Sequence, residues 1–172
     1  GLVVGGGYAF VGGLLDDVLD LRAGWKFLFQ GAAAGAAVLG GVALEGLVLP
    51  GPTEVVIPQP LAGALAFVFI IFMMNAYNFM DGMDGQAALF GLVSLAGLGL
   101  PLVGLHVAAS ATEALAVAAL AGSMSAFLLY NHPGCPPDRK TFMGDCGSQF
   151  VGFVLAVLAL RLNAADQHGT PL

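Results

Sequence analysis

Repeated apolar segments of about membrane-spanning length are the feature that most constrains the fold of this 172-residue chain. Hydrophobic residues make up 58% of it and charged residues only 9%, whereas about 25% of residues are charged in a soluble domain. A helix needs about 20 mostly apolar residues to cross a bilayer. The composition therefore predicts an all-α polytopic membrane protein embedded in a lipid bilayer, and it makes nucleic acid an unexpected partner.

Six apolar segments predict about six transmembrane helices. They cover residues 1–15, 27–49, 61–77, 87–105, 112–130 and 149–162. Proline and glycine mark the turns between them, and the stretch PGPTEVVIPQP is expected to form a short extended hairpin. Glu45 and Glu113, near the outer ends of helices, are expected to be solvated. Because the chain starts with an apolar segment at Gly1, we interpret residues 1–172 as one transmembrane domain from a longer protein.

Six of the eleven acidic residues gather in three short segments. The first acidic segment is LLDDVLDLR with Asp16, Asp17 and Asp20; the second is NAYNFMDGMDG with Asp81 and Asp84; the third is FMGDCGS with Asp145. Two predicted helices separate each segment from the next, so all three should emerge on the same side of the membrane. Carboxylates concentrated beside apolar helices suggest a site for a divalent metal and phosphates.

The basic residues predict which side this is. Four of the five belong to loops on the side of the acidic segments, namely Arg22, Lys26, Arg139 and Lys140, and only Arg161 lies toward the other end. Cytoplasmic loops of membrane proteins carry an excess of Lys and Arg. The acidic segments are therefore predicted to be cytoplasmic loops carrying the active site.

The first two acidic segments have spacings that favour function over structure. Asp16 and Asp20 are four residues apart, which would place both on one face of a helical end, where like charges repel. Asn75, Asn78 and Asp81 recur every three residues and form a polar stripe at the end of an apolar helix. A helix exit needs one capping residue and not such a set, so the stripe is predicted to bind a nucleotide or order metal-bound water.

The third acidic segment has two interpretations when it is taken alone. Gly144 and Gly147 flank Asp145, and this turn could present backbone N–H groups to a phosphate, with Asp145 near Mg²⁺. Alternatively, Ser148 is the N-cap of the last helix and Asp145 a turn residue. Cys135 lies in the same polar loop, without a histidine pair at ligand spacing, so zinc is not expected.

Together, LLDDVLDL, NAYNFMDGMDG and YNHPGCPPDRKTFMGDCGSQFVGF resemble the polyprenyl-phosphate N-acetylhexosamine-1-phosphate transferases of glycosyltransferase family 4. The resemblance covers essentially the whole chain, in the family's order. It implies transfer of an N-acetylaminosugar 1-phosphate from a UDP-sugar to polyprenyl (undecaprenyl) phosphate, with release of UMP, in cell-envelope glycan biosynthesis. It also implies Mg²⁺, with Mn²⁺ as an alternative, and a bacterial cytoplasmic membrane.

The resemblance assigns roles to individual residues. Asp16, Asp17, Asp81 and Asp84 are implied to be catalytic; Asn75, Asn78, Asn131 and Phe142 to bind substrate; and Asp145 and Asp17 to bind the metal. Direct attack by the lipid phosphate and a covalent enzyme intermediate are both compatible with these assignments. Whether the protein is a homodimer, and whether its product feeds lipopolysaccharide or another glycan, stays open.

The chain departs from the family pattern at several points. Asp20 replaces a lysine of the muramoyl-pentapeptide branch, and the segment from Asn131 to Asp145 is longer than in that branch, which favours the branch using simple UDP-N-acetylaminosugars such as UDP-N-acetylglucosamine. Gln86 stands where an apolar residue is usual. The family's N-terminal helices and its C-terminal histidine-rich loop are not in these 172 residues, and His132, His106 and His168 do not replace that loop.

Three other functions compete with the transferase. An ion-coupled transporter would also use carboxylates beside the membrane, but it is expected to place them near the midplane. A CDP-alcohol phosphotransferase would follow its Asp-Gly segment with Ala-Arg, which DGMDGQAALF does not. An inactive assembly subunit is the third alternative.

Overall fold

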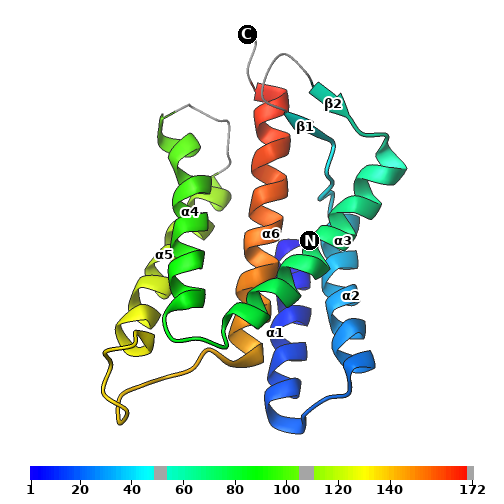
Figure 1. Ribbon diagram of the computed structural model, residues 1–172. Helices are drawn as coiled ribbons and strands as arrows, with labels where there is room; N and C mark the ends of the chain where they lie inside the picture. The colour runs from blue at the N-terminus through cyan, green and yellow to red at the C-terminus, as the bar shows by residue number, and fades with distance from the viewer. Residues whose placement is uncertain (49–53, 105–110, 170–172) are drawn as a thin grey trace.

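The computed structural model describes residues 1–48, 54–104 and 111–169, which form six helices and one short β-hairpin (Figure 1). In chain order these are α1 (Leu2–Leu19), α2 (Ala23–Leu39), β1 (Gly46–Val48), β2 (Glu54–Val56), α3 (Gln59–Met80), α4 (Gln86–Gly104), α5 (Ala111–Asn131) and α6 (Gly144–Gly169). The predicted all-α class is confirmed. The predicted hairpin is present as an antiparallel β1–β2 pair, whereas His106 lies outside the described residues.

Four of these helices are each long and apolar enough to cross a membrane. They are α1, α3, α5 and residues 144–164 of α6. α3, with 22 residues, is about 33 Å long at 1.5 Å per residue, which matches a hydrocarbon core of about 30 Å. The chain is therefore built as a multi-pass membrane protein.

Three predicted helix boundaries were wrong. The helix predicted over residues 27–49 stops at Leu39, because Gly40 and Gly41 follow and Gly41 has a φ of 89°, a left-handed conformation that favours glycine and ends helices. α1 continues past residue 15 to Leu19, and α6 begins at Gly144 and not at residue 149. The acidic residues of the first and third acidic segments thus lie largely within helices.

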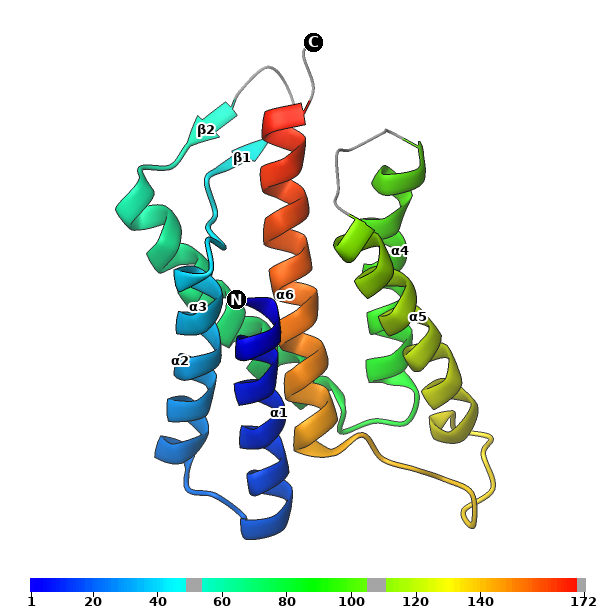
Figure 2. The same ribbon diagram turned by 180° about the vertical axis from the view of Figure 1, so that it is seen from behind.

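α6 is the central helix. Of its membrane-spanning stretch 67% is buried, against between 22% and 33% for α1, α3 and α5. It packs against α1 on one side and α3 on the other, while α2 packs against α1 and α3. α4 and α5 form an antiparallel pair beside this group, as both views show (Figures 1 and 2).

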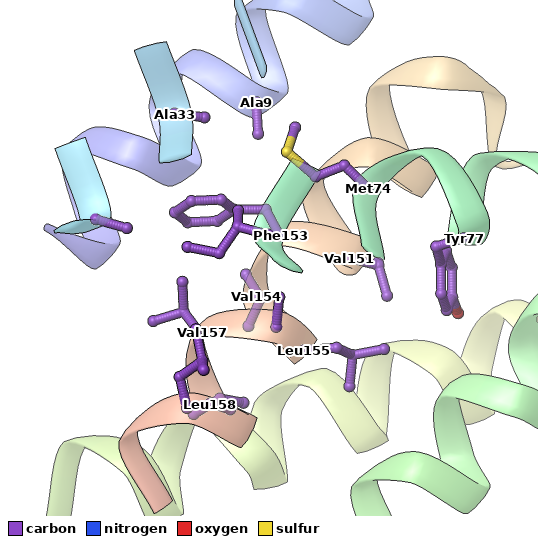
Figure 3. Close-up of a cluster of buried hydrophobic side chains, with 14 of the residues drawn as sticks. Ala9, Ala33, Met74, Tyr77, Val151, Phe153, Val154, Leu155, Val157 and Leu158 are labelled. Atoms are coloured by element: carbon purple, nitrogen blue, oxygen red, sulfur yellow. The ribbon is translucent and has the colours of Figure 1, made fainter. Parts of the chain in front are cut away.

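Small residues let the helices approach closely around α6. Phe153 of α6 is fully buried, and it lies between Ala9 and Ala33 on one side and Met74 on the other (Figure 3). In lipid, helix association depends on such close packing, because apolar burial alone gives little drive. At the crossing of α3 and α6, a Cβ added to Gly152 would lie 2.8 Å from the backbone oxygen of Met73. Glycine is therefore required at that crossing.

Glu113 is not solvated, contrary to expectation. Its side chain is buried in the first turn of α5, and one carboxylate oxygen accepts a hydrogen bond from Nε of Arg161 on α6 at 2.6 Å. A buried carboxylate is stable only when it is paired and hydrogen-bonded. This ion pair joins α5 to α6 at the end of the bundle away from the acidic segments.

The Gly152 contact predicts a strong effect of one methyl group. Gly152→Ala should lower the free energy of unfolding by about 1–3 kcal/mol, because the neighbouring backbone of α3 must move. Thermal unfolding in detergent measures this loss. Gly97→Ala is the matched control, since a Cβ there meets nothing within 4 Å. Equal melting temperatures for the two variants would contradict the close helix crossing.

Candidate active site

The three acidic segments meet at one end of the bundle, where α1 and α3 end and α6 begins (Figure 1). Hydrogen bonds link Asp17 to the backbone of Asp145, and Asn78 to the Asp145 side chain. The prediction that the segments share one side of the protein is confirmed. Residues up to 128 positions apart are thereby brought into direct contact.

Asp17 caps the N-terminus of α6 from the neighbouring helix. Its Oδ1 accepts a hydrogen bond from the N–H of Asp145 at 2.9 Å, and its Oδ2 accepts one from the N–H of Cys146 at 3.0 Å. The first N–H groups of a helix lack intrahelical partners and attract negative charge. Ser148 is therefore not the N-cap, and these two N–H groups are not open to a phosphate, as one interpretation of the third acidic segment had predicted.

Two glycines make the cap geometrically possible. Gly144 has a φ of 70°, and a Cβ there would lie 2.9 Å from Asp17 Oδ2. A Cβ on Gly13 would lie 2.5 Å from the backbone of Asp145 and Cys146. Any side chain at either position would push α1 away from the start of α6.

Asp16 and Asp145 form a carboxylate pair joined by Lys26. Asp16 has only 2% of its side chain exposed and forms an ion pair with Lys26 through Oδ2, while its Oδ1 accepts a hydrogen bond from the N–H of Leu21 at 3.0 Å. The same ammonium lies 3.4 Å from Asp145 Oδ2. The two carboxylates also lie within hydrogen-bonding reach of each other. The first and third acidic segments thus share one cation.

Asp20 does not lie on the same helical face as Asp16. It is the C-cap of α1 with a φ of 49°, and its side chain is exposed. The helical spacing of four that suggested a joint site is interrupted there, because α1 ends at Leu19. Asp16 instead finds its partner on α6.

Asn78 connects the second acidic segment to the carboxylate pair. Its Nδ2 donates to Asp145 Oδ1 at 2.6 Å and to Ser148 Oγ at 2.9 Å. Both acceptors lie on α6, in its first two turns. Asn78 therefore fixes the orientation of the Asp145 carboxylate relative to α3.

Asp81, the C-cap of α3, is the carboxylate at this end with the clearest electrostatic shift. Burial raises its pKa from the ordinary 3.8 to about 6, the backbone N–H of Gly144 opposes this rise, and the nearby negative charges of Asp145 and Asp17 add to it. A carboxyl group with a pKa in this range can exchange a proton near neutral pH.

Asp84 and Asn131 tie two loops together. Asp84 forms an ion pair with Lys140. Asn131 is buried; its Oδ1 accepts from the N–H of Gly85 at 2.8 Å, and its Nδ2 donates to the carbonyl of Thr141 at 2.8 Å. Phe142 follows with 71% of its side chain exposed. The loop after α5 is thus held against the turn after α3, with the Phe142 ring free to contact a ligand.

Asn75 lies one turn deeper in the bundle and joins an amide network. Asn75 and Gln30 exchange reciprocal side-chain hydrogen bonds of 2.9 and 3.2 Å, and Gln30 also donates to Gln149 at 3.3 Å. This network links α2, α3 and α6 beneath the carboxylate pair. Asn75 keeps part of its side chain exposed, so it can still contact a ligand.

The donor set suits a hard divalent cation that keeps open positions. Within the described residues, no group of three or more His, Cys, Asp or Glu side chains is arranged to hold a metal. Mg²⁺, however, typically takes one or two protein carboxylates and completes its shell with water and substrate phosphates. Asp16 and Asp145 provide two carboxylates, and Asp16 Oδ2 accepts no hydrogen bond from the described part of the chain. These residues fit a Mg²⁺ site.

Sequence reasoning missed Lys26, Gln30, Gln149 and Lys140 as members of this site. The lysines could have been found, because they account for two of only five basic residues in the chain and were predicted to lie on the side of the carboxylates. The glutamines carried no such signal, because each stands alone in an apolar helix.

Comparison with known proteins agrees with this arrangement. The profile of glycosyl transferase family 4 matches residues 1–163. A Bacillus subtilis protein named as a probable undecaprenyl-phosphate N-acetylglucosaminyl 1-phosphate transferase is 34% identical over 161 residues, which are 92% of this chain and 42% of that protein. The decaprenyl-phosphate N-acetylglucosaminephosphotransferase of Mycolicibacterium smegmatis is 35% identical over 90% of this chain and 39% of its own length.

A second branch matches as well. A Synechococcus phospho-N-acetylmuramoyl-pentapeptide-transferase is 37% identical over 163 residues, covering 86% of this chain and 44% of its own length. The fold and the site define a membrane protein with a carboxylate-rich phosphate-transfer centre. The chain belongs to glycosyl transferase family 4, and it spans less than half the length of these curated relatives.

The Asp17 cap predicts a local loss of stability. Asp17→Ala should destabilise the start of α6 by about 1–2 kcal/mol, and hydrogen exchange at the amides of Asp145 and Cys146 should quicken. Asp17→Asn keeps one acceptor oxygen and should restore part of the protection. Asp20→Ala, at an exposed position, is the control. Unchanged exchange in Asp17→Ala would rule out the cap.

The raised pKa of Asp81 predicts a pH-dependent stability difference. Because the folded-state pKa of about 6 exceeds the ordinary 3.8, folding favours the protonated acid, so wild-type stability decreases as pH rises from about 4 through about 6. Asp81→Asn lacks this ionisation. With metal chelated, the melting temperature of Asp81→Asn minus that of wild type should increase across this window. Parallel curves would contradict the shift.

Proposed function

We propose that this chain carries the catalytic core of a polyprenyl-phosphate sugar-1-phosphate transferase. The reaction moves an N-acetylaminosugar 1-phosphate from a UDP-sugar to polyprenyl phosphate and releases UMP, as a step in cell-envelope glycan synthesis. The observation that carries the proposal is the meeting of Asp16, Asn78 and Asp145 at one end of the bundle. The printed names of relatives from two family branches, both polyprenyl- or muramoyl-type phosphotransferases, support the same reaction class.

The reaction balances as a single displacement. An oxygen of the lipid phosphate forms a bond to the sugar-linked phosphorus of the UDP-sugar, the bond from that phosphorus to the bridging oxygen breaks, and the electron pair leaves with UMP. Direct attack is favoured over a covalent intermediate at Asp17, because both oxygens of Asp17 already accept hydrogen bonds from α6.

The residues of the site divide this work. Asp81, with a pKa of about 6, is matched to the second ionisation of a phosphate group, also near 6, and is placed to accept the proton of the lipid phosphate. Asn78 orients the Asp145 carboxylate, and the exposed ring of Phe142 offers a stacking surface for uracil. When bound by Asp16 and Asp145, Mg²⁺ would supply positive charge to offset repulsion between the phosphates.

The membrane setting fits the carrier. Four apolar helices of spanning length provide a hydrocarbon environment for the polyprenyl chain, while the site lies at their ends. Four of the five basic residues lie toward that end, which supports a cytoplasmic orientation, on the side where UDP-sugars are available. An ion-coupled transporter is disfavoured because the carboxylates gather at the helix ends and not at the midplane.

The test is UMP release by membranes containing the full-length protein, supplied with UDP-N-acetylglucosamine, undecaprenyl phosphate and Mg²⁺. Wild type should release UMP only when lipid and metal are both present. Asp145→Asn and Asp81→Asn should each lower kcat about 10²–10⁴-fold, the range for lost acid–base or electrostatic groups. Asp138→Asn changes an exposed acid of the same loop and should leave the rate unchanged.

Two results would count against the proposal. Full activity in Asp145→Asn would remove the third acidic segment from the site. Failure of the folded wild-type protein with every UDP-N-acetylaminosugar tested, together with no binding of UDP-sugar, would favour the assembly role.

A further inference from the structure

Lys26 stands out because its ammonium occupies the place where two carboxylates converge. It is ion-paired with Asp16 and lies 3.4 Å from Asp145. Asp16 has 2% of its side chain exposed and Asp145 has 30%, while Lys26 keeps 34% exposed. The lysine thus reaches a nearly buried pair of acids from the open side of the site.

This pair requires a cation. Two adjacent carboxylates cannot both stay ionised without a neighbouring positive charge, and a buried charge without a partner is unstable. Of the described groups, Lys26 is the basic side chain that contacts both acids. Asp16 Oδ2 nonetheless accepts no well-oriented hydrogen bond from the described residues, so the contact is an ion pair that a better-coordinating cation can replace.

The position of Lys26 in its helix favours such a replaceable contact. Lys26 lies in the first turns of α2, which begins at Ala23, and positive charge near a helix N-terminus is opposed by the helix dipole. The carboxylates offset this unfavourable placement. Once a divalent cation neutralises them, the attraction that holds Lys26 against them weakens.

We propose that Lys26 and the divalent metal occupy the Asp16–Asp145 pair in turn, so that Lys26 holds the empty site together and is released when the metal binds. This rests on the proposed function, because it takes the pair to be the metal site. The released ammonium remains within one side-chain length of the pair and can bind a substrate phosphate oxygen. Lys26 is thus a positioning residue that couples metal loading to the readiness of the site for phosphate.

Metal affinity tests the proposal without relying on turnover. Mn²⁺ binding to the detergent-purified full-length protein is measured by electron paramagnetic resonance, without substrates. Lys26→Met removes the competing ammonium and should tighten Mn²⁺ binding about tenfold, which corresponds to about 1.4 kcal/mol. Arg22→Met is the matched control: it removes a positive charge next to the same helix end, but Arg22 makes no ion pair with either acid in the described structure. It should change the affinity less than twofold.

The outcomes separate this proposal from its neighbours. Weaker Mn²⁺ binding in Lys26→Met would show that the lysine only organises the acids, and would overturn the exchange. Equal tightening in Arg22→Met would reduce the effect to general charge. No Mn²⁺ binding by folded wild type or by Lys26→Met would overturn both this inference and the metal site, whereas normal exchange without UMP release would count against the proposed transferase alone.

A second measurement uses the wild-type chain and so does not depend on how a variant folds. Acetylation of Lys26 by a water-soluble reagent is followed by mass spectrometry with and without Mg²⁺. Release of the ammonium should make Lys26 acetylation several-fold faster when Mg²⁺ is present. Lys140, which pairs with Asp84, is the internal control and should not change. Slower or unchanged acetylation of Lys26 would contradict its release.

Discussion

The capping of α6 by Asp17 is the interaction on which the rest of the site depends. It joins the end of α1 to the start of the central helix, and Gly13 and Gly144 leave the space that this contact needs. Because Asp145 and Cys146 are the capped residues, the cap sets where the Asp145 carboxylate lies relative to Asp16. A carboxylate that looks catalytic by its position in the sequence therefore also builds the scaffold.

The site is a balance of charges at the end of an apolar bundle. Lys26 neutralises Asp16 and Asp145, and Lys140 neutralises Asp84, so the chain places two of its five basic side chains directly against the acidic segments. Amide groups from Asn78, Asn75 and Gln30 then fix the side chains without adding charge. Such an arrangement can accept metal and phosphate while the surrounding helices remain in lipid.

The sequence alone was sufficient for the class, the number of helices and the meeting of the acidic segments, because apolar length and the parity of crossings determine them. It was not sufficient for contacts between helices. The Asp16–Asp20 spacing suggested a shared face, but the left-handed turn at Asp20 sent Asp16 to a partner on α6. Asn131 was predicted to bind substrate, a role that stays a prediction, while its amide bonds to Gly85 and Thr141 depend on loop geometry that no motif encodes.

The central claim is that carboxylates from α1 and α6 form one cation site. Pulsed electron–nuclear spectroscopy of bound Mn²⁺ in protein labelled with ¹³C at the aspartate carboxyl carbons tests it most directly. The account predicts ¹³C couplings from directly bound carboxylates that decrease in both Asp16→Asn and Asp145→Asn and stay unchanged in Asp138→Asn. Couplings that persist in full in either of the first two variants would show that the acids of α1 and α6 do not share a metal.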